Sequence, residues 1–526
     1  MARSIASHPR LGLAFALALV ALLLSAGVPV LDEESYLDIA RQLDPARPYD
    51  WSRPWQPYGA VPEPDAFVYA HPPLFLLWAH LWGRAAQFAP GAVAAIKVAM
   101  ALPWAALLGW SVGRLAERCL SRPWLAVGAY CAAPIVILGV QRGLMPDLMV
   151  TALSTFAFVA FVEAVDSVGG FSLRWQAMGG IALGAAAATK YPALLLAPAL
   201  LFFAQERQAL GRGRVFWACA LGLFLGVEMW LFFVYGRVHL LYVLQRADEI
   251  ARGSLEGRGL GVLARLALAA SPIALLVGLR PGLSLGLGAL GLGALALGMP
   301  EGSGWELILS VGAFALCGAV ALAPLVQGLA SPAPDLRRST LRSLSCWGLL
   351  VIGGVVLGHN FSAPRYLLPA VAPILLVGAA AAEHHARRRA LWHLGAALHG
   401  LLGLALTVAE HRFFTAGAEL AAEVARSMPA ATFAGEWSFR HGLSQAGWRF
   451  YSGALPPGAR LVSPTESSPP ELPAGLVRER VWVAGEGLLR VVDAERGIGL
   501  YGETIGPLPF GLGAGPLEAV TLWRVP

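Results

Sequence analysis

Long apolar runs recur along most of this sequence, and they restrict its fold more than any other feature. A run of about 20 apolar residues is long enough for a helix to cross a lipid bilayer. Only structures that satisfy their own backbone hydrogen bonds survive in the hydrocarbon. The chain is 57% hydrophobic and 14% charged, whereas soluble domains are about 25% charged. The sequence therefore predicts an all-α polytopic membrane protein.

We expect about thirteen transmembrane helices. They are 11–31, 92–113, 124–141, 145–166, 176–189, 191–204, 215–236, 261–279, 282–299, 305–328, 344–361, 367–382 and 390–409. The first is read as a retained helix, with a cleaved signal peptide as the alternative. The stretch 176–204 is interrupted at Thr189–Pro192, so it is either two short helices or one kinked helix.

Arginines in the short loops indicate the orientation, because cytoplasmic loops are enriched in positive charge. With a cytoplasmic N-terminus, four basic loops share that side. They hold Arg114, Arg118 and Arg122; Arg207, Arg212 and Arg214; Arg337, Arg338 and Arg342; and Arg387, Arg388 and Arg389. The loop 237–260 also carries arginines and runs against this rule. We expect a bacterial inner-membrane protein and no nucleic-acid partner.

The composition changes after residue 409, which divides the chain into two domains. Residues 1–409 form the predicted membrane domain, in which 32–91 is the first periplasmic loop and 71–89 is a helix along the membrane surface. Residues 410–526 form a small periplasmic α/β domain. Strands are expected around 481–483 and 519–525, and a helix over 436–447.

Two acidic positions are candidates for chemistry on the non-cytoplasmic side. Asp32 and Glu33 follow the first span, where Asp32 would be placed to abstract a proton from a hydroxyl or amine. The alternative is a cap or acidic first turn for the next helix. Asp147 opens the span 145–166, and it is either a functional ionisable group or a residue favoured by the helix dipole.

Three basic or partly basic positions face the same side in this topology. Lys190 interrupts an apolar stretch, which suits either a lipid phosphate or a side chain that snorkels to the interface. Arg365 lies in the loop 359–366, and arginine binds phosphate with two parallel hydrogen bonds. His71 precedes two prolines and either contacts a phosphate or caps a helix.

Other chemistries have less support. The five cysteines all lie in or beside apolar runs and are expected to be packing residues. No metal site is predicted, because no His, Cys and Asp set has ligand spacing; the residues specify no cofactor and leave a need for a divalent cation open. The Gly-rich phosphate loop of ATP-driven proteins is absent from the sequence.

Five short motifs, in this order, resemble those of the polyprenyl-phosphate-sugar-dependent glycosyltransferases of the GT-C fold. They are Asp32-Glu33, His71-Pro72-Pro73-Leu74, Pro146-Asp147-Leu148, Gly184–Thr189 with Lys190-Tyr191, and Arg365-Tyr366-Leu367-Leu368-Pro369. The resemblance covers residues 11–409. It is greatest to bacterial relatives of the dolichyl-phosphate-mannose–protein mannosyltransferases, a group that includes the lipid A aminoarabinose transferases.

The resemblance implies an inverting hexosyl- or pentosyltransferase that moves a sugar, mannose or a pentose, from a polyprenyl-phosphate donor to a periplasmic protein, lipid or glycan. It implies catalytic roles for Asp32, Glu33 and Asp147. It further implies that Lys190, Arg365, His71 and Tyr366 bind the donor phosphate; His71 stands where aminoarabinose transferases have a lysine. Membrane lipids are the other expected partners.

Two other functions fit the same residues. A transporter or flippase of a lipid-linked sugar would line its pathway with these charges, but such proteins often show repeated halves, which this chain lacks. An inactive relative that serves as an assembly scaffold is the third hypothesis, and the retained Asp32, Asp147 and Lys190 argue against it.

Overall fold

The computed structural model describes residues 8–24, 32–50, 71–86, 93–167, 170–245, 254–270, 304–331, 335–359, 362–451, 453, 455–467 and 472–526. The expected span 282–299, residues 271–279 of the expected span 261–279 and the central part of the loop 32–91 lie outside the described residues.

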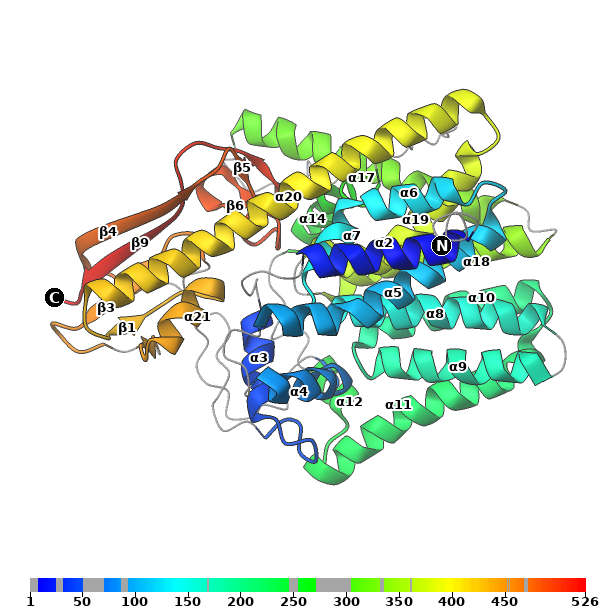
Figure 1. The fold of residues 1–526 in the computed structure, drawn as a ribbon, viewed down its shortest axis with the longest axis horizontal. Coiled ribbons are helices and arrows are strands. Elements are labelled where there is room, and N and C mark those ends of the chain that lie inside the picture. The colour runs from blue at the N-terminus through cyan, green and yellow to red at the C-terminus, as the bar shows by residue number, and fades with distance from the viewer. Residues whose placement is uncertain are drawn as a thin grey trace.

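Helices form the body of the protein, and most of the long ones lie side by side (Figure 1). The α-helices are α2 (Pro9–Leu24), α3 (Glu33–Gln42), α4 (Leu74–Ala86), α5 (Val93–Cys119), α6 (Trp124–Ala132), α7 (Pro134–Gln141), α8 (Pro146–Asp166), α9 (Gly170–Ala187), α10 (Leu196–Glu206), α11 (Arg214–Tyr235), α12 (His239–Gln245), α14 (Leu255–Leu266), α17 (Trp305–Ala330), α18 (Leu336–Gly358), α19 (Leu368–Ala382) and α20 (Ala386–Ser427). Short 3-10 helices η3 (Tyr191–Leu195), η4 (Leu210–Gly213) and η5 (Pro364–Leu367) lead into α10, α11 and α19.

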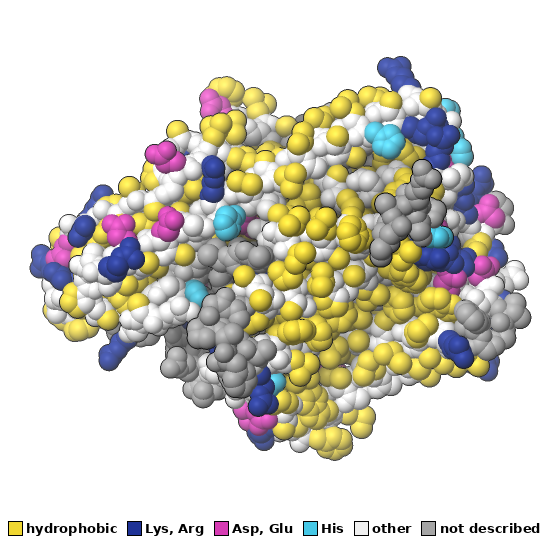
Figure 2. All heavy atoms as spheres, viewed as in Figure 1, with side chains coloured by type: hydrophobic (Ala, Val, Ile, Leu, Met, Phe, Trp, Pro, Cys, Tyr) yellow, Lys and Arg dark blue, Asp and Glu magenta, His cyan; other side chains and the backbone are white. Residues whose placement is uncertain are grey.

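Seven of the described helices are long and apolar enough to cross a membrane, or eight if α6 and α7 are one broken span. Two shorter apolar helices, Pro9–Leu24 and Tyr191–Glu206, accompany them. Hydrophobic side chains cover much of this body, whereas charged ones gather over the C-terminal part and at the opposite end of the helices (Figure 2). The chain is therefore a multi-pass membrane protein, and the total of about thirteen spans stays a prediction.

Proline and glycine explain local features of the helical body. The helices α6 and α7 meet at a bend of 60°, because Pro134 cannot continue the first helix and keeps Ala133 extended. The stretch 176–204 is two helices, with Lys190 extended between them (φ −161°, ψ 124°). Gly113 lets α2 lie directly on α5, since a Cβ there would stand 2.4 Å from the Cα of Arg10.

The four expected basic loops meet at one end of the helices. The contacts there are Arg118–Asp166 (2.8 Å), Arg342–Glu206 (2.6 Å), Arg337–Glu383, Arg212 to the Val165 carbonyl (3.4 Å) and Arg389 to the Glu383 carbonyl (2.8 Å). This grouping agrees with a single basic face, as the positive-inside rule requires. The cytoplasmic location of that face stays a prediction.

The C-terminal residues build a small sheet region around the end of α20. Its strands are β1 (Thr432–Phe433), β2 (Arg449–Phe450), β3 (Arg460–Pro464), β4 (Val477–Glu486), β5 (Leu489–Arg490), β6 (Val492–Asp493), β7 (Ile498–Gly499), β8 (Gly511–Leu512) and β9 (Pro516–Arg524), with helices α21 (Trp437–Gln445) and η6 (Ala494–Arg496). Five of them form a sheet in the order β2-β1-β3-β9-β4, in which β9 is antiparallel to both neighbours. The expected strands and helix are confirmed.

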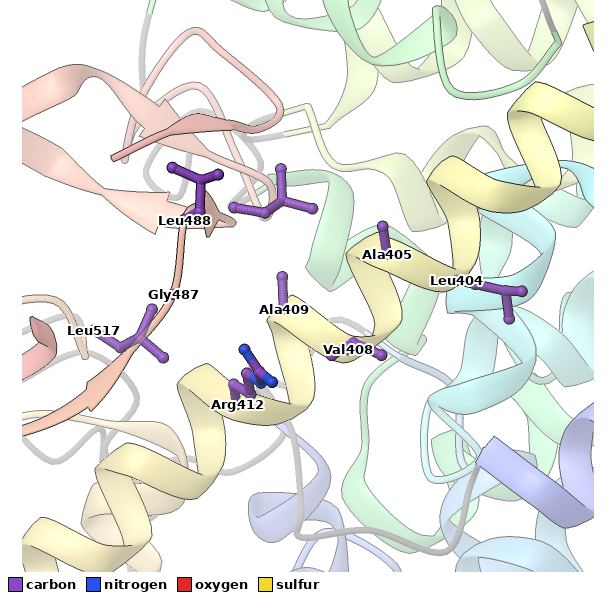
Figure 3. Close-up of a pocket in the computed structure, with 9 residues that line it drawn as sticks. Leu404, Ala405, Val408, Ala409, Arg412, Gly487, Leu488 and Leu517 are labelled. Carbon is purple, nitrogen blue, oxygen red and sulfur yellow. The ribbon is translucent and has the colours of Figure 1, made fainter. Parts of the chain in front are cut away.

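Helix α20 connects the two parts. It is 42 residues long and continues past residue 409, where the sequence changes composition. Leu420 and Val424 near its end pack with Phe433, Phe439 and Val520 in the core of the C-terminal region. Earlier along α20, before Leu420, a cavity of about 330 Å³ separates this helix from the turn between β4 and β5 (Figure 3).

Candidate active site

Four predicted site residues occupy helix beginnings at the end of the body opposite the basic loops. Asp32 is the N-cap residue of α3, and Asp147 lies in the first turn of α8 after Pro146. Lys190 precedes η3, and Arg365 follows Pro364 in η5. Proline is favoured at such positions because the first turn leaves its N–H groups unpaired. A proline in the local sequence thus sets the start of three of these helices, and each start lies next to a charged side chain.

The four side chains form one ionic cluster. The Lys190 Nζ is 2.7 Å from the Asp147 Oδ1, and the Arg365 Nε is 3.9 Å from the Asp147 Oδ2. An Arg365 Nη2 lies 3.5 Å from the Asp32 Oδ2. Arg365 therefore stands between two carboxylates that come from different helices, α3 and α8.

Exposure distinguishes the two carboxylates. The Asp32 side chain is 20% exposed, against 6% for Asp147 and 6% for Lys190. Asp32 makes no capping hydrogen bond to α3. Of the two carboxylates, Asp32 is thus the one within reach of an incoming molecule, while Asp147 is enclosed with its cations.

Tyr366 supports both cations. The Lys190 Nζ lies 4.4 Å from its ring centroid, and its hydroxyl accepts a hydrogen bond from Arg365 at 3.2 Å. The His359 ring stacks on the Tyr366 ring at a centroid separation of 4.1 Å. A cation over an aromatic face is attracted by the ring quadrupole. Tyr366 therefore holds the two cations close together despite their mutual repulsion.

His71 lies near this cluster and is uncharged at neutral pH. Burial, followed by the nearby charge of Lys190, lowers the pKa of His71 to about 3. Its carbonyl accepts a hydrogen bond from the Tyr49 hydroxyl at 2.8 Å. The side chain can exchange a hydrogen bond with an anion, but it does not supply the positive charge of the lysine that it replaces in the resemblance.

The low pKa of His71 leads to a pH prediction. The affinity for a phosphodiester donor is expected to change less than about twofold between pH 7.5 and 5.5, because His71 stays neutral throughout. Folding stability, by contrast, should fall as the pH drops below about 6.5, since the unfolded histidine binds a proton there and the folded one does not. Donor binding measured across this range checks the first point. Tighter binding at low pH that His71→Gln abolishes would contradict it.

Glu33 lies apart from the cluster. Its carboxylate is 2.7 Å from the Lys97 Nζ, and both side chains are 1% exposed or less. It also accepts a hydrogen bond from the Leu144 backbone at 3.1 Å. This pair joins α3 to α5 and to the segment before α8. The structure thus gives Glu33 a position suited to holding Asp32 and Asp147 in place, and its catalytic role stays a prediction.

Breaking this pair is expected to destabilise the fold. Lys97→Met leaves a buried carboxylate without its cation, which typically costs about 3–5 kcal/mol of folding free energy. The double variant Glu33→Gln/Lys97→Met should recover most of that loss, because no lone charge remains. Thermal unfolding in detergent measures both. Equal melting temperatures for wild type and Lys97→Met would show that the pair contributes nothing.

Two further sets of interacting buried polar side chains were not predicted from the sequence. Arg142 is paired with Glu410 at 2.5 Å, and the Tyr501 hydroxyl donates to the same Glu410 oxygen at 3.0 Å. Next to Lys190, the Tyr191 hydroxyl donates to Glu228 at 2.7 Å. Glu228 interrupts the apolar run 215–236, and an ionisable residue inside such a run is the signal that marks it.

The described residues contain no group of three or more His, Cys, Asp or Glu side chains arranged to hold a metal ion. The cysteines among them are free thiols, of which Cys119 is buried.

The combination of multi-pass helices and a C-terminal sheet region also occurs in solved structures. The chain is similar to the solved structures of ArnT from Cupriavidus metallidurans. The structure bound to undecaprenyl phosphate matches with a TM-score of 0.52 at 13% identity, and the apo state with 0.51 at 14%. Each match covers 86% of this chain and 92% of ArnT.

No family model matches the sequence, and no curated protein matches it. The likeness to ArnT is thus one of fold. It agrees with the fold that the five motifs predicted, over a length that includes the C-terminal region.

Proposed function

We propose that this chain is a membrane glycosyltransferase that takes its sugar from a polyprenyl-phosphate donor. The main support for this proposal is the ionic cluster, in which two cations and an accessible carboxylate share one site. Its members are Asp32, Asp147, Lys190 and Arg365. The fold likeness to a protein solved with undecaprenyl phosphate supports the proposal.

Lys190 and Arg365 hold the donor phosphate in this proposal. A phosphate exchanges for Asp147 as a partner of the two cations, and guanidinium binds phosphate with parallel hydrogen bonds. The beginnings of α8 and of the η3 and η5 segments lie at the same place, and helix N-termini favour anions. Asp147 keeps the cations paired when the site is empty.

Asp32 serves as the general base. An acceptor hydroxyl or amine attacks the anomeric carbon and forms the new glycosidic bond, while its proton passes to the Asp32 carboxylate. The bond from the anomeric carbon to the phosphate oxygen breaks, and its electron pair leaves with the polyprenyl phosphate. Attack opposite the leaving group inverts the anomeric carbon. The cations stabilise the charge that develops on the phosphate.

An apolar cavity of about 340 Å³ lies beside the cluster and suits the polyprenyl chain. Its walls are Leu74, Leu77, Trp78 and Leu81 of α4, Trp104 of α5, Met149 and Leu153 of α8, and Ala185 of α9, with Pro45 and His80. Met149 follows Asp147 on α8, and Ala185 lies in the last turn of α9, just before the extended Lys190. An apolar cavity on the helices that lead to Asp147 and Lys190 suits the hydrocarbon part of a lipid with a phosphate head.

Filling this cavity should weaken the binding of long donors selectively. Ala185→Phe is expected to raise the Kd for undecaprenyl phosphate about tenfold, because a lost isoprenoid contact of 1–2 kcal/mol has that effect. A short-chain analogue that does not reach the cavity should bind as before. Ile181→Phe is the matched control, since Ile181 is 53% exposed on the same helix. Equal losses for both lipids would place the chain elsewhere.

The sugar is proposed to be mannose or a pentose, and the acceptor a periplasmic protein, lipid or glycan. The ionic cluster then faces the periplasm of a bacterial inner membrane. The test is transfer of labelled sugar by purified protein from a panel of undecaprenyl-phosphate hexoses and pentoses to fractions of a membrane extract. Label recovered in one fraction names the acceptor class. If the labelled donor instead crosses the bilayer of a vesicle without chemical change, the protein is a transporter.

A further inference from the structure

The C-terminal region reaches the ionic cluster through one short segment, residues 499–506, here called the C-terminal turn. It contains Tyr501 and Glu503 and lies between β7 and the strand bridge at Leu508. It makes contacts with three separate parts of the helical body. Two of those parts carry residues of the cluster.

The first contact leads to Arg365. Glu503 accepts two hydrogen bonds from Ser362, one from the backbone N–H and one from the hydroxyl, both at 2.6 Å. Ser362 is fully buried and begins the segment that continues through Pro364 into η5. Fixing Ser362 therefore fixes the start of the turn that carries Arg365 and Tyr366.

The second contact leads to Asp147. The Tyr501 hydroxyl donates to Glu410 of α20, and the same carboxylate binds Arg142 at 2.5 Å. The Arg142 guanidinium also lies 5.2 Å from the Tyr501 ring centroid. Arg142 stands in the short segment between α7 and α8, just before Asp147. All three side chains are buried, so water does not compete for these bonds.

The third contact anchors the turn itself. Buried Arg265 of α14 donates to the carbonyls of Gly499 and Gly506, the latter at 3.1 Å. The turn can close so tightly only with glycine, since a Cβ on Gly506 would stand 2.3 Å from the carbonyl carbon of Gly497. The Arg258 guanidinium of the same helix donates to the His359 carbonyl at 2.6 Å. One helix thus holds both the turn and the loop that the turn contacts.

From these contacts we propose that the C-terminal turn is a positioning element of the active site, with Glu503 and Tyr501 as its positioning residues. Glu503 sets the place of Arg365 through Ser362, and Tyr501 sets the segment before Asp147 through Glu410 and Arg142. The C-terminal region is on this account part of the donor site and not a separate acceptor-binding module. The inference rests on the proposed function for its ligand, the donor phosphate.

The test compares Glu503→Ala, Glu503→Gln and Glu495→Ala. Glu495 is the matched control, because it is an exposed glutamate of η6 in the same region. Undecaprenyl phosphate binding should weaken about tenfold or more in Glu503→Ala and be partly restored in Glu503→Gln, whose amide oxygen still accepts from Ser362. Adding Ser362→Ala to Glu503→Ala should cost little more, since the two residues act through one contact.

Hydrogen exchange provides a readout that needs no ligand. The amide of Ser362 should exchange faster in Glu503→Ala than in wild type and Glu495→Ala, because its acceptor is gone. Wild-type binding and exchange in a folded Glu503→Ala protein would overturn the inference and leave the proposed function standing. If wild type neither binds the lipid nor transfers sugar, the proposed function falls and takes the inference with it.

Discussion

Replacing Asp32 by asparagine is expected to lower kcat by about 10²–10⁴-fold, the usual contribution of a general base. Asparagine has the same shape but cannot accept the acceptor's proton. Asp32 also contacts Arg365 at 3.5 Å, at the outer limit of a hydrogen bond, so the cluster should survive its loss. Donor affinity is therefore expected to stay within about threefold of wild type, which corresponds to less than about 0.7 kcal/mol.

The appropriate readouts are single-turnover rates and undecaprenyl phosphate binding on the same preparation. Asp44→Asn is a matched control, because Asp44 follows α3 and caps the local turn at Ala46 instead of contacting the cluster. Normal turnover by Asp32→Asn would remove Asp32 from the mechanism. A loss of donor binding equal to the loss of rate would make it a structural partner of Arg365.

Lys190→Ala is expected to have the second largest effect, through donor affinity. Hydrogen bonds to charged groups contribute about 1.5–3 kcal/mol each, so the loss of the ammonium should weaken phosphate binding about 10–100-fold. The Lys190 side chain is only 6% exposed and its Nζ contacts Asp147, an arrangement that favours phosphate binding over the snorkelling alternative.

A comparison with Lys97 distinguishes the effect of losing a charge at the donor site from the effect of losing any buried lysine. Lys97→Met removes the other lysine of the chain, whose partner Glu33 lies apart from the cluster. It should lower stability, with folded protein keeping its donor affinity, whereas Lys190→Ala should lower affinity. Unchanged apparent affinity in Lys190→Ala would show that the donor phosphate binds elsewhere.

The sequence predicts the helical body well because long apolar runs have one solution in a bilayer. The spans 92–113, 145–166, 215–236 and 305–328 coincide with α5, α8, α11 and α17. Other boundaries depend on contacts that the sequence does not show. Helix α20 continues well past residue 409 because its later turns bury Leu420 and Val424 in the C-terminal core.

The candidate site could be predicted in part for the same reason. Charges such as Asp147 and Lys190 stand out against apolar surroundings, and topology places them at one end. Glu33 is also a charged residue beside an apolar run, and yet it pairs with Lys97. Which residue it pairs with depends on how the helices pack. The C-terminal turn gave no signal, since Glu503 and Tyr501 lie in a short Gly-rich stretch whose contacts are long-range.

Release of free undecaprenyl phosphate from a panel of undecaprenyl-phosphate sugars would measure the proposed glycosyltransferase activity itself. Purified protein would be incubated with each donor and a membrane extract as acceptor source, alongside Asp32→Asn. Release is expected from one donor class, and it should depend on the acceptor and be lost in Asp32→Asn. No release from any donor by folded wild-type protein, or equal release by Asp32→Asn, would contradict the proposed function.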